Sequence, residues 1–309
     1  MTATLQASSS PAVRAAQDRE RLATRLLRSS ERHSYDPVVD LDWAAPLDPT
    51  VPAMPLHRLS LYGTPLWESL DDERRVQLSW HEWASITSVG LWFEVILMQG
   101  LLRYVYDRSP HSAHAQYGLT EVGDETRHAV MFGRIAEQLA PGARYRPSAR
   151  VHSLGRLFKT LGSGPAFFSA TLVAEETLDR LQRDMQDDPS ILALTRDSSR
   201  IHVTEEARHV SYAREAVLRQ TPQLGRAALS WHRQVAAIAA TLIVDSFVDP
   251  AVYTAVGLDS AEAVRQVKAS PYHAATRRWM GEKVTAFLRD TGMIGGSSTL
   301  LWRRASLIS

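Results

Sequence analysis

One repeated spacing restricts the possible fold of this chain more than any other feature. Two pentapeptides, DETRH at residues 124–128 and EEARH at residues 205–209, lie 81 residues apart. Glu94 and Glu175 stand 31 residues before the central glutamate of each pentapeptide, and they are also 81 residues apart. A glutamate followed by Glu-x-x-His therefore occurs twice with the same internal spacing. This indicates that one structural unit has been duplicated within the chain.

The internal spacing fits a pair of antiparallel helices. Glu94 lies about 15 residues before a turn at Pro110, and Glu125 lies about 15 residues after it. Folding two helices across this turn brings the two carboxylates to the same height, and the second unit repeats the arrangement around Pro189. Residues three apart are about 60° apart around a helix, so both side chains of each Glu-x-x-His face the same way.

One Glu from each of two helices, with Glu-x-x-His from each of the other two, is the ligand set of ferritin-like dimetal bundles. We therefore predict an all-α fold with a ferritin-like four-helix bundle core and additional N- and C-terminal helices. Glu94 is the only charged residue from Trp83 to Leu102. A buried carboxylate is costly unless a cation lies beside it, which supports a metal site. The 81-residue register also selects Glu175, rather than its neighbour Glu176, as the inward-facing residue.

His202 breaks the symmetry between the two units. It lies four residues before Glu206 and seven before His209, so the three side chains share one helix face. Its counterpart in the first unit is Glu121. We interpret His202 as an extra nitrogen ligand, with a histidine satisfied within the core as the alternative.

Asp124 and Glu205 are candidates for supporting the histidine ligands. Each precedes the histidine of its own pentapeptide by four residues, one helical turn away. Each could accept the ring N–H of that histidine and fix its tautomer. The alternative is that these acids are solvated or paired with Arg127 or Arg208.

Composition narrows the function classes. The 309 residues contain no cysteine, which excludes disulfides, thiolate nucleophiles and iron–sulfur clusters and leaves His and carboxylates as metal ligands. The formal net charge is +1, from 35 basic and 34 acidic residues, so no basic excess indicates a nucleic-acid partner. No secretory signal is visible, and the polar residues and Glu94 within residues 83–102 argue against membrane insertion. We expect a cytoplasmic protein.

Helix-breaking residues predict the organisation of the chain. We expect residues 1–66 to form an N-terminal helix and a proline-rich lead-in, 67–295 a ferritin-like diiron domain, and 296–309 a loose C-terminal tail. Long helices are predicted over about 71–107, from after Pro110 to about 140, and over 165–186, 190–220, 223–248 and 260–291, with an irregular connection from 141 to 164.

The ligand pattern resembles the p-aminobenzoate N-oxygenase family of diiron proteins. The residues that carry the resemblance are Glu94, Glu125-x-x-His128, Val173-Ala174-Glu175 and His202-x-x-x-Glu206-x-x-His209. The resemblance implies that Glu125 and Glu206 bridge two irons. It also implies that Glu94 and His128 complete one iron, and that Glu175, His202 and His209 complete the other.

The expected function is that of an O2-activating oxygenase with two Fe ions as cofactor. The resemblance implies oxidation of an amine or arylamine nitrogen through a peroxo-diiron intermediate. Two alternatives remain open: C-hydroxylation or desaturation of a lipid-like or carrier-bound substrate, and a non-catalytic iron or radical protein. The expected partners are a small-molecule substrate, an external electron donor and a second copy of the chain in a homodimer.

Overall fold

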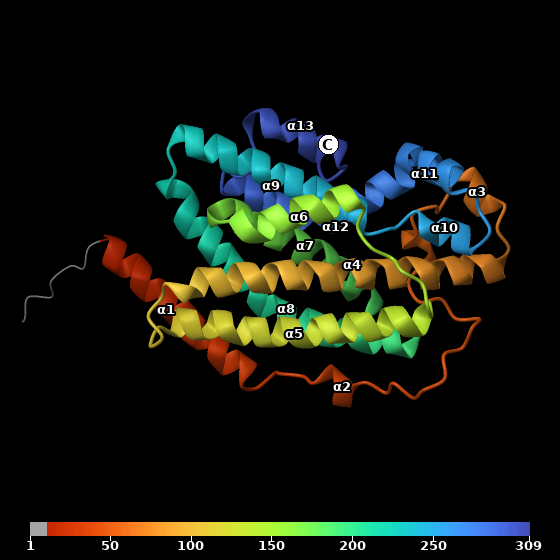
Figure 1. Ribbon diagram of the computed structural model, residues 1–309, viewed down its shortest axis with the longest axis horizontal. Coiled ribbons are helices and arrows are strands. Elements are labelled where there is room, and N and C mark those ends of the chain that lie inside the picture. Colours follow the sequence, from red (N-terminus) through yellow and green to blue (C-terminus); the bar gives the residue numbers. More distant parts are fainter. Residues whose placement is uncertain (1–10) are drawn as a thin grey trace, which may run out of the picture.

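Four long helices form the centre of the computed structural model, which describes residues 11–309 (Figure 1). They are α4 (Asp72–Tyr106), α5 (Ala113–Leu139), α7 (Gly164–Met185) and α8 (Ala193–Gln220). Helix α4 packs along α5 and α7 along α8, and the two pairs meet where α5 contacts α8 and α4 contacts α7. No strand occurs between residues 11 and 309, and the predicted all-α bundle is confirmed.

Local sequence determines where these helices begin. The Asp71 carboxylate accepts a hydrogen bond from the N–H of Arg74 at 2.9 Å and so caps α4. Helix α7 begins at Gly164, whose φ of +61° is a left-handed conformation that would strain any other residue. Helix α8 begins three residues later than predicted. Before it, the N–H of Ser190 donates to the Asp188 carboxylate at 2.9 Å and holds a turn.

The connection from 141 to 164 was predicted to be irregular, and this prediction is wrong for part of it. It contains α6 (Ala149–Leu161), whose N-terminus is capped by Ser148. The apolar residues of α6 recur at helical spacing, and the helix packs across α4. The basic and glycine residues between them had suggested a loop, but packing of this apolar stripe stabilises a helix.

Two predictions near the C-terminus are also wrong in detail. The helix predicted over 260–291 is divided into α11 (Ser260–Ala269) and α12 (Pro271–Asp290), because Ser270 caps the second helix and Pro271 has no N–H to continue the first. The stretch after Gly295 is not loose. It forms α13 (Thr299–Arg304), which packs on α9 (Arg226–Ser246) and buries Trp302 completely.

The N-terminal segment runs along one side of the bundle. Helix α1 (Pro11–Ser30) packs against α5 and α8, and the chain then follows the lower edge of the molecule in Figure 1. The remaining short elements are α2 (Pro37–Asp40), η1 (Leu56–Arg58), α3 (Pro65–Glu68), η2 (Thr221–Gln223), α10 (Ala251–Ala255) and η3 (Gly296–Ser298).

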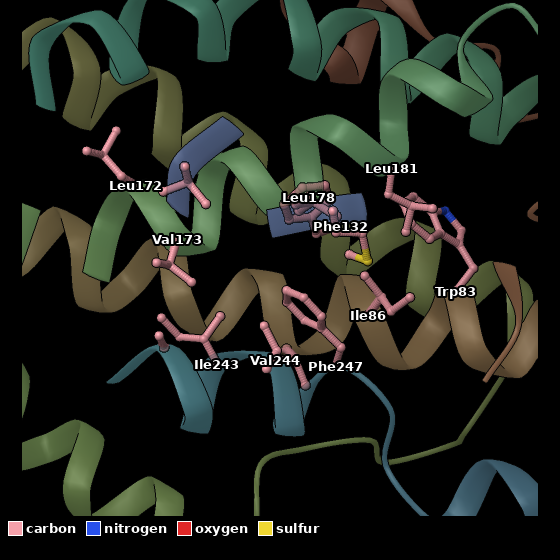
Figure 2. Packing of buried hydrophobic residues seen from close by; sticks show 14 of the residues in the cluster. Trp83, Ile86, Phe132, Leu172, Val173, Leu178, Leu181, Ile243, Val244 and Phe247 are labelled. Atoms are coloured by element: carbon pink, nitrogen blue, oxygen red, sulfur yellow. The ribbon is translucent and has the colours of Figure 1, made fainter. Parts of the chain in front are cut away.

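Apolar side chains from α4, α5, α7 and α9 meet in one core. Figure 2 shows Trp83 and Ile86 of α4 close to Leu181 of α7. Val244 of α9 and Phe247, which follows the end of α9, lie along the opposite edge of α4 in this view. Asp72–Tyr106 and Arg226–Ala255 are long and apolar enough to cross a membrane by length and composition. The most apolar windows of these two stretches are 50% and 44% buried within the protein, as is usual for bundle helices.

Candidate metal centre

All seven predicted ligands converge in the middle of the bundle. Each side chain is at most 4% exposed. Their donor atoms form four overlapping groups, and within each group the atoms lie within 4.8 Å of one another. The groups are Glu125/His128/Glu206/His209, Glu94/His128/His202, Glu175/His202/Glu206 and Glu94/Glu125/Glu175.

The rings of His128 and His209 point their Nδ1 atoms at Glu125 and Glu206. His128 Nδ1 lies 2.9 Å from an oxygen of Glu125 and 3.3 Å from one of Glu206. His209 Nδ1 lies 2.9 Å from Glu125 and 3.1 Å from Glu206. His202 is turned differently, with Nε2 3.8 Å from Glu94 and 3.6 Å from Glu206. Two Nδ1 atoms and one Nε2 atom are therefore available as nitrogen ligands.

The supporting acids bind the histidines of the opposite hairpin. His128 Nε2 lies 2.9 Å from Glu205, and His209 Nε2 lies 3.2 Å from Asp124. The predicted pairing of each acid with the histidine of its own helix is therefore wrong, because the ring Nε2 points across to the neighbouring helix. Each bond keeps a ring proton on Nε2, so that Nδ1 can bind a metal ion once its own proton is lost.

Asp124 and Glu205 form an outer layer around the candidate ligands, and two arginines and the N-terminal segment complete this layer. Arg208 Nη2 lies 3.1 Å from Asp124 and 3.5 Å from Glu205, and Arg127 also pairs with Asp124. The carbonyl of His33 accepts from Arg208 at 2.8 Å, and the N–H of Tyr35 donates to Glu205 at 3.1 Å. The acids therefore bind both a histidine and an arginine, so the two alternatives in the sequence were not exclusive.

Burial and mutual repulsion act on the glutamates. Burial raises the pKa of Glu94 and of Glu175 well above the usual value, and the charges of neighbouring carboxylates add to the effect. Burial would also raise the pKa of Glu206, but the adjacent ring of His209 and the hydrogen bond with His128 outweigh it and hold that pKa well below normal. The carboxyl groups of Glu125 and Glu206 thus favour the ionised form, and those of Glu94 and Glu175 favour the protonated form.

The three histidines also differ in the direction in which their pKa values are shifted. Burial disfavours a proton on His128, yet its hydrogen bonds to Glu125 and Glu205 outweigh burial and raise its pKa well above normal. Burial is likewise outweighed at His209 by the charges of Glu206 and Glu125, and its pKa is raised. Burial lowers the pKa of His202 to about 3, so this ring stays neutral.

The residues present fit a pair of divalent cations. Among residues 11–309, Glu94 Oε2, Glu206 Oε2 and both ring nitrogens of His202 have no hydrogen-bond partner although they are buried, a costly state that metal ligation would relieve. Four carboxylates balance the charge of two divalent ions. Outside them, Asp124 and Glu205 balance Arg127 and Arg208. Oxygen and imidazole ligands in this mixture suit iron among the transition metals.

The neighbouring acids Glu176 and Glu121 lie outside these groups. Glu176 forms an ion pair with Arg214 at 2.6 Å, and Glu175 faces the centre, as the register predicts. Glu121 is fully buried and neither of its oxygens has a hydrogen-bond partner among residues 11–309. Burial, strengthened by nearby carboxylates, raises the pKa of Glu121 well above normal and favours its protonated form.

Comparisons with known proteins identify the family of this chain. The model of the family described as p-aminobenzoate N-oxygenase AurF matches residues 16–292 of this chain. The chain belongs to this family. Uncharacterized proteins of Mycobacterium bovis and of two Mycobacterium tuberculosis strains are each 28% identical to it over 297 residues, covering 92% of this chain and 86% of the relative. The AurF family match spans every candidate ligand from Glu94 to His209.

A cavity beside the centre was not predicted from the sequence. It has a volume of about 330 Å³, lies among α4, α6, α7 and α9, and reaches Glu175. His232 on α9 is part of its lining. The cavity could not be found from spacing alone, because the walls come from four separate helices.

Proposed function

We propose that this member of the AurF family is a diiron oxygenase that uses O2 to oxidise the nitrogen of a small amine. The observation that carries the proposal is the buried set of four glutamates and three histidines, with donor atoms close enough to hold two ions. When bound, two irons would supply the electrons and the open coordination positions that O2 activation needs. Membership of the AurF family supports iron as the metal and nitrogen as the oxidised atom.

The protein's own residues would do three things in this function. Glu125 and Glu206 would bridge the irons, Glu94 and His128 would complete one of them, and Glu175, His202 and His209 the other. Asp124 and Glu205 would hold the rings of His209 and His128 with Nδ1 facing inward. The apolar cavity next to Glu175 would hold the substrate and exclude water.

The test loads the protein anaerobically with Fe(II), adds O2 and a panel of amines, and analyses the products by mass spectrometry. We expect about two irons per chain and products that gain oxygen on nitrogen. Glu125→Ala and Glu206→Ala should lose both irons and all product, because each residue bridges. One zinc or no metal in protein expressed with iron would refute the dimetal proposal.

Oxidation of a carbon atom is the second candidate. The cavity wall is almost entirely apolar, which also suits hydroxylation or desaturation of a lipid-like substrate. The same mass spectra distinguish the two reactions, because fragmentation locates the added oxygen on nitrogen or on carbon. Either reaction needs an external electron donor. We also propose a homodimer in the cytoplasm, for which sedimentation velocity and cell fractionation are the direct measurements.

A further inference from the structure

The cavity beside Glu175 has an unusual lining for a site that is expected to bind a polar amine. Its walls are formed by aromatic and aliphatic side chains such as Trp92, Phe167 and Leu242. Among the described residues that line it, no lysine or arginine occurs, and Glu175 is the only carboxylate. The cavity therefore offers no positive partner for an anionic group on a ligand.

The nearest polar groups do not supply a positive charge either. The Nδ1 atom of His232 accepts a hydrogen bond from the N–H of Ala166 at 3.4 Å. Burial lowers the pKa of His232 below its usual value, so the ring is neutral at pH 7. Arg103 is charged, but it does not line the cavity, and its guanidinium is held outside by the carbonyls of Thr160 and Gly162, the latter at 2.7 Å.

The inner end of the cavity is also electrically balanced. With two ferrous ions bound, the four glutamate ligands would make the centre formally neutral. In the outer layer, Asp124 and Glu205 are balanced by Arg127 and Arg208. Neither layer attracts an anion into the cavity, where a carboxylate would lose its hydration without compensation.

The mouth of the cavity is apolar as well. Leu157 and Leu161 on α6 are 56% and 66% exposed, and Trp231 and Ile238 on α9 are 69% and 47% exposed. All four side chains also line the cavity. Large exposed hydrophobic residues gathered around an opening mark a ligand-binding site. A molecule that enters here meets apolar surface from the mouth to Glu175.

We propose, on the basis of the function proposed above, that the substrate is an uncharged apolar amine that carries no carboxylate. Its amine end would lie toward Glu175 and its apolar body would fill the space between α4, α6, α7 and α9. The volume of about 330 Å³ is at the small end of the range for ligand pockets, which suits a molecule of one or two rings. The chain would thus discriminate against p-aminobenzoate itself, the compound in the description of its family.

The test uses the metal-free full-length protein and two probes of similar size, 4-methylaniline and 4-aminobenzoate. The two molecules share the ring and the amine and differ in a methyl group against a carboxylate. Calorimetric titration, checked by the fluorescence of Trp92 and Trp231, should give binding of 4-methylaniline at least about tenfold tighter. Equal affinity, a preference for 4-aminobenzoate, or no binding of either probe at about 1 mM would overturn the inference.

Variants of Leu154 show whether binding occurs in this cavity. Leu154 is half-buried on α6 and lines the cavity wall. Leu154→Arg should shift the preference toward 4-aminobenzoate by at least about tenfold. Ser153→Arg, the matched control, adds the same charge at an exposed position of α6 outside the cavity and should keep the wild-type preference. Unchanged preference in Leu154→Arg would place binding elsewhere and refute the proposal. Ala170→Trp, which fills the cavity, should abolish binding of 4-methylaniline with the circular dichroism spectrum unchanged.

These measurements test the proposed substrate class independently of the proposed oxygenase function. Because no iron is present, selective binding of 4-methylaniline supports the substrate class even if the iron-loaded protein proves inactive. Conversely, an iron-loaded protein that oxidises 4-aminobenzoate as fast as 4-methylaniline would support the proposed function and overturn the substrate class.

Discussion

His209 on α8 and Asp124 on α5 are joined by a hydrogen bond of 3.2 Å between Nε2 and a carboxylate oxygen. The equivalent bond from His128 to Glu205 runs in the opposite direction across the same interface at 2.9 Å. Each hairpin therefore orients the histidine of the other. Both hairpins are therefore needed to orient the two histidines of the candidate metal centre.

This crossed arrangement predicts which ion each acid supports. Asp124→Asn should weaken the position that His209 serves, and Glu205→Gln the position that His128 serves, each by about 10–100-fold. Stepwise titration of the metal-free protein with Co(II), followed by its visible absorption, measures the two positions. Glu137→Gln, an exposed substitution on α5, is the control. An equal loss at both positions in either variant would mean that the acids do not act through individual rings.

Substitution of the adjacent glutamates on α7 tests the register. Glu175→Ala should lose metal at one position, because its carboxylate faces the centre. Glu176→Ala should keep both ions but lower the free energy of unfolding by about 1–3 kcal/mol, since Arg214 loses its partner. Iron analysis and urea unfolding separate the two effects. Retention of both ions in Glu175→Ala would show that this residue is not a ligand.

His202 and Glu121 occupy equivalent positions in the two units but differ in side-chain chemistry, and this difference gives a third prediction. His202→Ala should keep the helical fold and weaken one ion by more than the roughly 10–100-fold expected for outer-layer changes. Glu121→Gln should leave metal binding unchanged, because the buried carboxyl is already protonated and the amide has nearly the same shape. Circular dichroism and metal titration provide the readouts. If His202→Ala binds two ions normally, His202 is a core histidine and the site has six ligands.

Metal affinity should depend on pH with a definite sign. The raised pKa values of His128 and His209 mean that both rings hold protons at neutral pH in the metal-free protein. Glu94 and Glu175 favour the protonated form as well. Bound ions must displace these protons, so affinity should rise from about pH 6 to pH 8, with release of about two protons per ion. Titration in a weak buffer with a pH indicator counts them, and affinity that falls with pH would contradict this account.

Glu82 on α4 should make the stability of the metal-free protein depend on pH. Burial raises its pKa to about 7, although Ser60 donates hydrogen bonds to it. The unfolded chain loses this proton near 4.5 and the folded chain near 7, so the free energy of unfolding falls across that window and is constant above it. Glu82→Gln should therefore be more stable than the wild type at pH 8, by up to about 3 kcal/mol, and equal to it near pH 4. Urea unfolding at both pH values measures the difference.

The duplicated motif was sufficient to predict the two central hairpins and the residues that meet between them. Spacing along a helix determines which side chains share a face, and the turns at Pro110 and Pro189 determine which faces meet. The same reasoning failed for Asp124 and Glu205. A separation of four residues describes neighbours on one helix, whereas ring orientation and the approach of α5 to α8 decide the actual partner.

The cavity could not have been predicted in this way. Its walls depend on α6, which the sequence did not distinguish from a loop, and on the placement of α9 across the second hairpin. His232 lines the cavity because the first turn of α7 lies beside it, where the N–H of Ala166 donates to its ring. Such contacts between elements distant in sequence leave no periodic pattern in any one of them.

The hydrogen bond from Tyr35 to Glu205 joins residues 170 positions apart. During synthesis, residues 33–35 leave the ribosome long before α8 exists, so this segment can close over Glu205 and Arg208 only when nearly all ligands have been made. Residues 33–35 therefore form their contacts with Glu205 and Arg208 only after α8 has been made, although they are synthesised before any of the candidate ligands.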